Sequence, residues 1–254
     1  MIFATNQFVT YKSSFAAMPK KDYNDNIRKC LAGYGCAILI LTDGTIEVIG
    51  SNHYGQLGLT NQSPITKWTT VPQVTDVVTG SCCGYISILV RSDGQIYTAG
   101  YDGIGGIKMD DFKLHPTVRD IIAVSSTSNA IFLLTSSGNV LYSGDADQND
   151  RPGMIFKPFP ITDVVDISVS RTHALFLKSD GKLFRYGLFT TIGCTSENTL
   201  VAIATNNLKV KKITCGNGWS MIMDNEGDVY ILGKIYHTNI KTFTKIENIN
   251  LLGK

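Results

Sequence analysis

The stretch "TDGTIEVIGSNHYGQLGL", Thr42 to Leu59, decides the fold through the spacing of Gly44 and Gly50. The tripeptide "TDG" is typical of a hairpin turn, because glycine adopts a positive φ without a Cβ clash. The residues that follow, "TIEVI", have the β-branched composition of a strand. A turn, a strand and a second glycine six residues after the first therefore make one short pattern that can be sought elsewhere in the chain.

This pattern occurs five times, at steps of 50, 44, 43 and 46 residues. Four to six residues before the first glycine of each copy, all fifteen side chains are apolar. Such short apolar runs, bounded by turn residues, predict strands that are buried on both faces. We expect the second glycine to allow close backbone approach where neighbouring units crowd together. The structural glycines are Gly44, Gly50, Gly94, Gly100, Gly138, Gly144, Gly181, Gly187, Gly227 and Gly233.

A further strand is predicted ahead of each hairpin, where a valine or isoleucine lies seventeen residues before the first glycine. The linkers of 20 or more residues have room for a fourth strand. Units of this kind predict an all-β fold, a β-propeller of five recognisable blade repeats. The alternative is an irregular all-β sandwich. We expect one domain over 1–254, with its repeats near 27–50, 77–100, 121–144, 164–187 and 210–233.

The two ends of the chain suggest how the ring of blades closes. Residues 243–252 resemble the first strand of a further unit, with Ile249 and Leu252 at its apolar positions. Residues 1–8 resemble the tail of a unit, with Asn6 in the place of the asparagine in "IGSNHY". We therefore expect the termini to form a partial sixth blade that acts as a clasp.

Composition excludes several classes of protein. The chain is 43% hydrophobic and 17% charged, with a net charge of +2 and a pI near 8.1. These values do not fit a disordered chain or a strongly basic nucleic-acid-binding domain. No apolar run has the roughly 18 residues of a membrane span, and the start lacks a basic leader, so a soluble intracellular protein is expected. Six cysteines without a C-x-x-C pair predict small buried hydrophobes rather than a zinc site.

Motifs for catalysis are missing from the sequence. It has no nucleophile elbow, zinc-protease helix, phosphate-binding loop or dinucleotide fingerprint. The four histidines lie in different repeats or linkers, and we expect His173 to be a buried structural residue. In "GDADQNDRPG", 144–153, Asp145 and Asp147 have the spacing of calcium ligands, but Asp150 stands where a calcium loop needs glycine. We therefore expect no enzyme, no metal and no cofactor, and an acidic surface loop at this point.

The first repeat resembles the regulator of chromosome condensation family, whose repeats run roughly G-x-x-H-S-x-A-L-x-x-D-G-x-[VL]-[YF]-x-W-G-x-N-x-x-G-Q-L-G. "LTDGTIEVIGSNHYGQLG" matches the second half, and "SRTHALFLKSDGKLFRYG" matches at His173. The resemblance runs from Ile27 to Gly233, although "GQLG" occurs once. It implies either an interaction platform or guanine-nucleotide exchange on a Ran-type GTPase.

The family's chromatin binding depends on a basic N-terminal tail, and residues 1–26 contain three lysines. We therefore expect no direct contact with nucleic acid or chromatin and no membrane partner. The resemblance favours a non-enzymatic protein–protein interaction module or scaffold, whose partner is a small GTPase or a larger assembly. The alternative is a guanine-nucleotide exchange factor for a Ran-type or other small GTPase.

The loops that follow the second glycine of successive repeats are expected to emerge on one side of the ring and to bind the partner, since function concentrates in loops on rigid scaffolds. The alternative for each is an ordinary solvated turn. The partner-binding residues are His53, Tyr54, Tyr101, Asp102, Asp145, Asp147, Asp150, Arg151, Tyr236 and His237.

Overall fold

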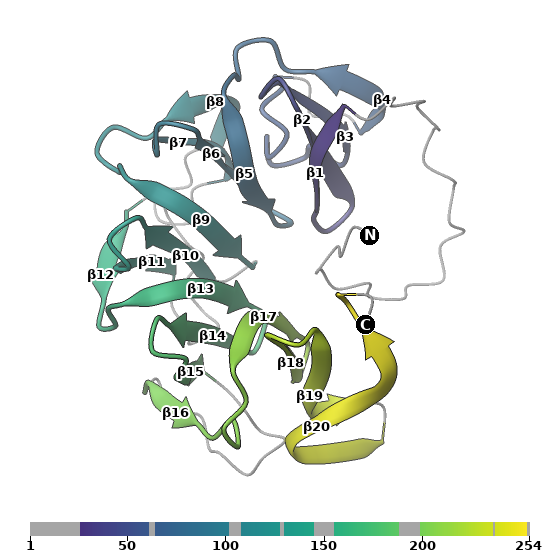
Figure 1. The fold of residues 1–254 in the computed structure, drawn as a ribbon. Helices are drawn as coiled ribbons and strands as arrows, with labels where there is room; N and C mark the ends of the chain where they lie inside the picture. The colour runs from purple at the N-terminus through teal and green to yellow at the C-terminus, as the bar shows by residue number, and fades with distance from the viewer. Residues whose placement is uncertain are drawn as a thin grey trace. The chain divides into compact units, whose positions relative to one another are not determined.

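The computed structural model describes residues 26–60, 64–101, 108–127, 130–144, 155–187, 199–235 and 237–252. Within them the chain forms five four-stranded antiparallel sheets and no helix, so the expected all-β class is confirmed (Figure 1). Each linker supplies the fourth strand for which the sequence left room. The chain divides into two compact units, unit 1 over 1–124 and 152–154, and unit 2 over 125–151 and 155–254.

Unit 1 contains two sheets in which the strands pair in chain order. The strands of the first are β1 (Ile27–Ala32), β2 (Cys36–Leu41), β3 (Ile46–Gly50) and β4 (Ile65–Thr70). Those of the second are β5 (Val77–Cys82), β6 (Ile86–Arg91), β7 (Ile96–Tyr101) and β8 (Lys108–Leu114).

Three further sheets follow, and β9 runs across the boundary between the units. The third sheet consists of β9 (Ile121–Ser126), β10 (Ala130–Thr135), β11 (Val140–Gly144) and β12 (Lys157–Phe159). The fourth consists of β13 (Val164–Val169), β14 (His173–Lys178), β15 (Leu183–Gly187) and β16 (Val201–Ile203). The fifth consists of β17 (Val210–Gly216), β18 (Trp219–Asp224), β19 (Asp228–Ile235) and β20 (Thr238–Asn250).

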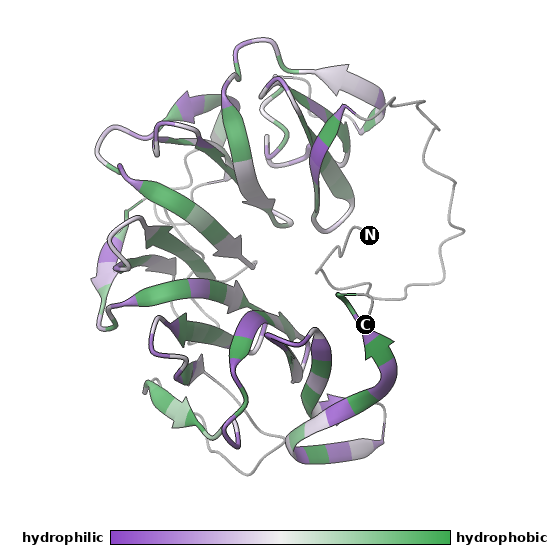
Figure 2. Cartoon of the chain, in the orientation of Figure 1, coloured by the Kyte–Doolittle hydropathy of each residue, from purple (hydrophilic) through white to green (hydrophobic). Residues whose placement is uncertain are grey.

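The central strands carry the core. In β2 the first five residues are buried, as the apolar run "CAILI" requires, and β6 and β14 repeat this pattern. The outer strand β20 instead alternates between buried, half-buried and exposed residues, and Figure 2 shows it as bands of hydrophilic and hydrophobic colour. Central strands are therefore covered on both faces, whereas the outermost strand borders solvent.

The first glycine of each pair occupies the hairpin turn between the second and third strands. Gly44 has a φ of +83°, and a Cβ built on it would lie 2.9 Å from the Cα of Asp76. The carbonyl of Gly44 also accepts a hydrogen bond from the N–H of Val77 at 3.0 Å. The hairpin turn of the first sheet thus positions the start of β5 in the next.

The second glycine makes a close approach within its own sheet, not between neighbouring sheets as expected. Gly50 has a φ of +105°, and a Cβ there would overlap the carbonyl oxygen of Gly35, in the turn between β1 and β2. Gly100 has a φ of +115° and would overlap the carbonyl oxygen of Tyr85 in the same way. The cause is the register, which pairs Ile86 with Gly100 at the end of the hairpin ladder.

The C-terminal segment also differs from expectation. Residues 238–250 form β20, the outer strand of the fifth sheet, rather than the first strand of a sixth repeat. Just beyond it, the N–H of Leu251 donates to the carbonyl of Gly227 at 2.9 Å, as Val77 does to Gly44. Residues 1–8 lie outside the described residues, so the clasp stays a prediction.

His173 links two sheets of unit 2 as a buried neutral side chain. Its Nε2 lies 2.8 Å from the Ser220 hydroxyl, and its Nδ1 lies 3.1 Å from the hydroxyls of Ser170 and Thr172. Burial, with the nearby charge of Arg185, lowers the pKa of His173 to about 3. The neutral ring therefore donates a hydrogen bond from one nitrogen and accepts at the other, and it carries no charge at neutral pH.

Replacing Gly100 by alanine should destabilise the protein far more than replacing Gly181. Both glycines have positive φ, but the Cβ of Gly100→Ala would overlap backbone, whereas nothing lies within 4 Å of the Cβ position at Gly181. We expect a loss of more than about 3 kcal/mol for Gly100→Ala and about 1 kcal/mol for Gly181→Ala, measured by urea unfolding. Equal losses would contradict the close approach.

The buried histidine should make the protein sensitive to mild acid. Unfolded, His173 takes up a proton below its ordinary pKa of 6.5, whereas folded it stays neutral down to about 3. The folded state therefore loses free energy relative to the unfolded state as pH falls below 6.5. Between pH 7 and 5 wild type should lose about 2 kcal/mol more than His173→Gln, which keeps a polar group near Ser220. Parallel stability curves for the two proteins would disprove this.

Candidate functional site

Four of the ten predicted partner-binding residues lie within the described residues. His53, Tyr54 and Tyr101 are in unit 1, and His237 occupies the turn between β19 and β20 in unit 2. The remaining six lie outside the described residues: Asp102, Asp145, Asp147, Asp150, Arg151 and Tyr236. The site can therefore be built from the unit 1 residues.

Tyr54 is the centre of an aromatic cluster in unit 1. Its ring centroid lies 4.7 Å from that of Tyr85 at an interplanar angle of 74°, and 6.2 Å from that of Tyr101 at 65°. Both arrangements are edge-to-face, the geometry that the aromatic quadrupole favours. All three tyrosines are half-buried, so each residue remains partly accessible to solvent.

Tyr34 extends this cluster from the turn between β1 and β2. Its side chain is 66% exposed, and a Cβ built on Gly84 would lie 3.4 Å from the Tyr34 Cβ. Gly84 directly precedes Tyr85 in the corresponding turn of the second sheet. We call Tyr34, Tyr54, Tyr85 and Tyr101, with the exposed His53 beside them, the tyrosine surface.

Two buried amides hold the loop that carries Tyr54. Asn52 donates from Nδ2 to the carbonyl of Leu59 at 2.7 Å and accepts from the N–H of Leu57 at 2.8 Å. Gln56 accepts from the N–H of Tyr54 at 3.0 Å and donates to the carbonyl of Gly84 at 3.2 Å. Asn52 is 0% exposed and Gln56 is 1% exposed. The loop of the first sheet is thus tied to a turn of the second.

The remaining two glycines of the opening stretch stand where this loop contacts β8. Gly58 has a φ of +65°, and a Cβ on it would overlap the ring of Phe112 in β8. Gly55 has a φ of +76°, and its Cβ would lie 2.8 Å from the carbonyl oxygen of Met109. Both glycines therefore let the loop pack against the outer strand of the next sheet.

Tyr34, Tyr85 and Gln56 were not predicted from the sequence. The predicted residues lie in loops that follow the third strand of a repeat, whereas Tyr34 and Tyr85 lie in turns between the first and second strands. In an antiparallel sheet alternate connections emerge at the same end, so both kinds of turn belong to one surface. The signal was present, because "AGYGC" and "CGYIS" both place a glycine–tyrosine pair in this turn.

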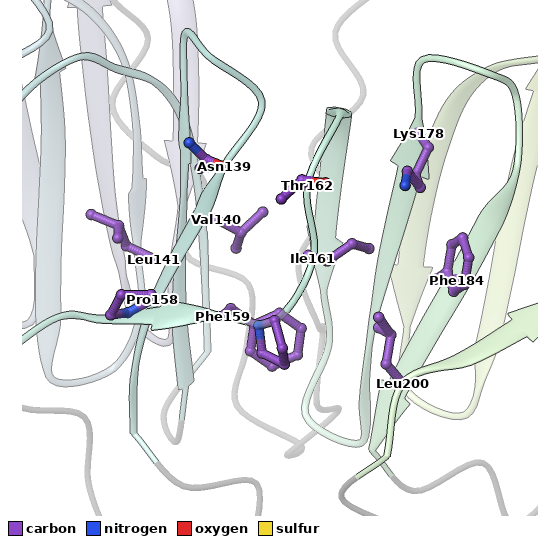
Figure 3. Close-up of a pocket in the computed structure, with 11 residues that line it drawn as sticks. Asn139, Val140, Leu141, Pro158, Phe159, Ile161, Thr162, Lys178, Phe184 and Leu200 are labelled. Atoms are coloured by element: carbon purple, nitrogen blue, oxygen red, sulfur yellow. The ribbon is translucent and has the colours of Figure 1, made fainter.

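Unit 2 contains a separate hollow of about 570 Å³ (Figure 3). In this view Val140 lies on one side of the hollow and Phe184 and Leu200 on the other, with Phe159 between them. Lys178 also lines the hollow. The residues that line it, all described, include no histidine, cysteine, aspartate or glutamate. The hollow thus offers apolar contact area without an acid–base pair.

The described residues contain no group of three histidine, cysteine, aspartate or glutamate side chains that could hold a metal ion. They also include no helix that is long and apolar enough to cross a membrane. His115, in unit 1, is buried, and its Nδ1 accepts hydrogen bonds from the backbone N–H groups of Thr117 and Val118. The tyrosine surface therefore remains the best-defined site, and it offers aromatic faces and hydroxyl groups.

Comparison with known proteins agrees with this architecture. No protein-family model matches the chain. The Drosophila melanogaster "Regulator of chromosome condensation" is 28% identical over 149 residues, which cover 56% of this chain and 26% of that protein. The mouse protein of the same name is 23% identical over 199 residues, covering 75% and 39%. The chain thus spans less than half the length of these relatives.

The yeast "Guanine nucleotide exchange factor SRM1" is 24% identical over 182 residues, covering 59% of this chain and 38% of that protein. Among solved structures, yeast RCC1 (Prp20) bound to Kap60 has a TM-score of 0.74 at 18% identity, covering 87% of this chain and 63% of that one. Human WBSCR16 has the same TM-score at 15% identity, with coverages of 86% and 66%. The β-propeller fold is confirmed, and the chain is a divergent repeat protein that resembles the regulator of chromosome condensation family.

Proposed function

We propose that this chain is a non-enzymatic protein–protein interaction module, or scaffold, that binds its partner through the tyrosine surface of unit 1. One observation carries the proposal. Tyrosines from four separate turns and strand ends gather around Tyr54, whose loop is held by the buried amides of Asn52 and Gln56. Aromatic packing inside the sheets would not require the exposed position of Tyr34.

Tyrosine is suited to this task because its ring adds a large apolar area and its hydroxyl group tolerates water. Few rotatable bonds are frozen on binding, and tyrosines are enriched among the residues that dominate interface energies. The hydrogen bonds of Gln56 fix the Tyr54 loop before a partner arrives. Preorganisation of this kind lowers the entropy lost on association.

Similar proteins support a protein partner. Yeast RCC1 was solved in complex with Kap60, and Prp20p was studied for its binding to Gsp1p and histones. A partner protein, such as a small GTPase or a member of a larger assembly, is therefore proposed for this chain, without direct contact to nucleic acid. The proposed role needs no catalytic residue and no cofactor.

The alternative function is guanine-nucleotide exchange on a Ran-type or other small GTPase. It is favoured by one observation, the similarity to a protein named as an exchange factor. Exchange can proceed by displacing the nucleotide through contact alone, so it would use the same kind of surface. Binding without acceleration of nucleotide release separates a scaffold from an exchange factor.

Truncation of Tyr34 should weaken partner binding without unfolding the protein. We expect Tyr34→Ala to raise the Kd about 10- to 30-fold for a partner recovered with the wild-type chain, as measured by calorimetric titration. Ile155→Ala is the matched control, because Ile155 of unit 2 is 64% exposed against 66% for Tyr34. Equal affinities for the two variants would refute the tyrosine surface as the docking site.

Nucleotide release should stay at its intrinsic rate when the chain is added. We would load a panel of small GTPases, including a Ran-type protein, with fluorescent GDP and follow its loss by stopped flow against excess GTP. An active exchange factor serves as the positive control. Acceleration of any GTPase that is lost in Tyr34→Ala and kept in Ile155→Ala would replace the scaffold proposal with the exchange factor.

A further inference from the structure

Two cysteine thiols face each other beneath the tyrosine surface. Cys36 is the first residue of β2 and Cys82 is the last residue of β5, so they belong to neighbouring sheets of unit 1. A Cβ built on Gly33 would lie 3.1 Å from the sulfur of Cys36 and 3.1 Å from that of Cys82. Both sulfurs therefore border the same small space, which is open because residue 33 has no side chain.

Cys36 and Cys82 both carry free thiols. The Cys36 thiol donates to the carbonyl oxygen of Cys83, the residue after Cys82, at 3.9 Å, so it lies against the end of β5. Cys83, although adjacent in the chain, has its sulfur 3.3 Å from the carbonyl oxygen of Ile86 in its own hairpin. The facing pair is thus Cys36 with Cys82 and not the sequence neighbours Cys82 and Cys83.

The pair has an asymmetry that favours one thiol as the nucleophile. Hydrogen bonding with the Cys82 side chain lowers the pKa of Cys36. The same interaction, together with burial, raises the pKa of Cys82. A thiol reacts as its thiolate, so Cys36 is the side chain that reacts first. Cys36 is 7% exposed and directly follows the exposed turn residues Tyr34 and Gly35, whereas Cys82 is 1% exposed.

We propose that Cys36 and Cys82 form a reversible disulfide when the protein meets a hydroperoxide, and that this bond joins β2 to β5. The Cys36 thiolate attacks the peroxide O–O bond, which gives a sulfenic acid on Cys36 and, after protonation, releases water or an alcohol. The Cys82 sulfur then attacks the Cys36 sulfur and displaces hydroxide, which takes up the Cys82 thiol proton and leaves as water. Two thiols are oxidised and one peroxide is reduced.

A thiol-based metal site does not account for this pair. The described residues contain no cluster of three potential metal ligands, and two thiolates alone do not complete the four-coordinate shell of a structural zinc site. The disulfide would close a chain segment between residues 36 and 82 that runs through both sheets of unit 1. It would also hold the turns of Tyr34 and Tyr85 at a fixed spacing.

The experiment treats the reduced, full-length chain with an equimolar dose of hydrogen peroxide. Unreacted peroxide is removed, remaining thiols are alkylated in denaturant, and non-reduced peptides are identified by mass spectrometry. We expect a peptide pair joined through Cys36 and Cys82, a loss of two hydrogens from the intact mass, and full reversal by dithiothreitol. Recovery of Cys36 and Cys82 as alkylated thiols, or a link of either to another cysteine, would overturn the proposal.

Variants separate the two steps. In Cys82→Ser the Cys36 sulfenic acid cannot be resolved, so it should accumulate and react with dimedone, whereas Cys83→Ser should form the disulfide as wild type does. Far-ultraviolet circular dichroism and the unfolding midpoint of each variant before oxidation show whether it is folded. Dimedone labelling that is equal in folded wild type and folded Cys82→Ser would show that Cys82 is not the resolving thiol and would disprove the bond.

Discussion

Three of the four links between successive sheets are a backbone hydrogen bond from the first residue of one sheet to the hairpin glycine of the sheet before it. The N–H of Val77 donates to the carbonyl of Gly44, and the N–H of Ile121 donates to that of Gly94 in the same way. The glycine must have positive φ to turn the hairpin and must lack a Cβ to admit the neighbouring backbone. Positive φ is common to all five hairpin glycines. The lack of a Cβ is a second requirement at Gly44, Gly94 and Gly138, where backbone of the next sheet lies within 3.2 Å of the Cβ position.

The fold was predictable because its main constraints are local. Glycine spacing identifies hairpins through the sign of φ, and short apolar runs identify the central strands. The fourth strands escaped a firm prediction, since "ITKWTT" of β4 is only half-buried and carries no apolar run. The close approach at Gly50 was assigned to the wrong neighbour, because a sequence pattern shows that a residue must be small and does not show what it touches.

The site was predictable only in part, for a related reason. His53, Tyr54 and Tyr101 were found because they follow a recognisable glycine. Tyr34 and Tyr85 stand in turns that the repeat pattern does not mark, and only the pairing of antiparallel strands brings those turns to the same end. Gln56 could not be assigned at all from the sequence, because its role depends on the carbonyl of Gly84 in a different repeat.

The turn between β1 and β2 shows how architecture and site depend on each other. Gly50 can pair at the end of the hairpin only if the backbone of Gly35 lies against it, so a glycine of β3 fixes this turn. The same turn exposes Tyr34 toward solvent and places Cys36 in the interior beside Cys82. Because the spacing of the repeat glycines sets the turn, a substitution at Gly50 would displace the tyrosine and the thiol together, although it touches neither the surface nor the sulfur.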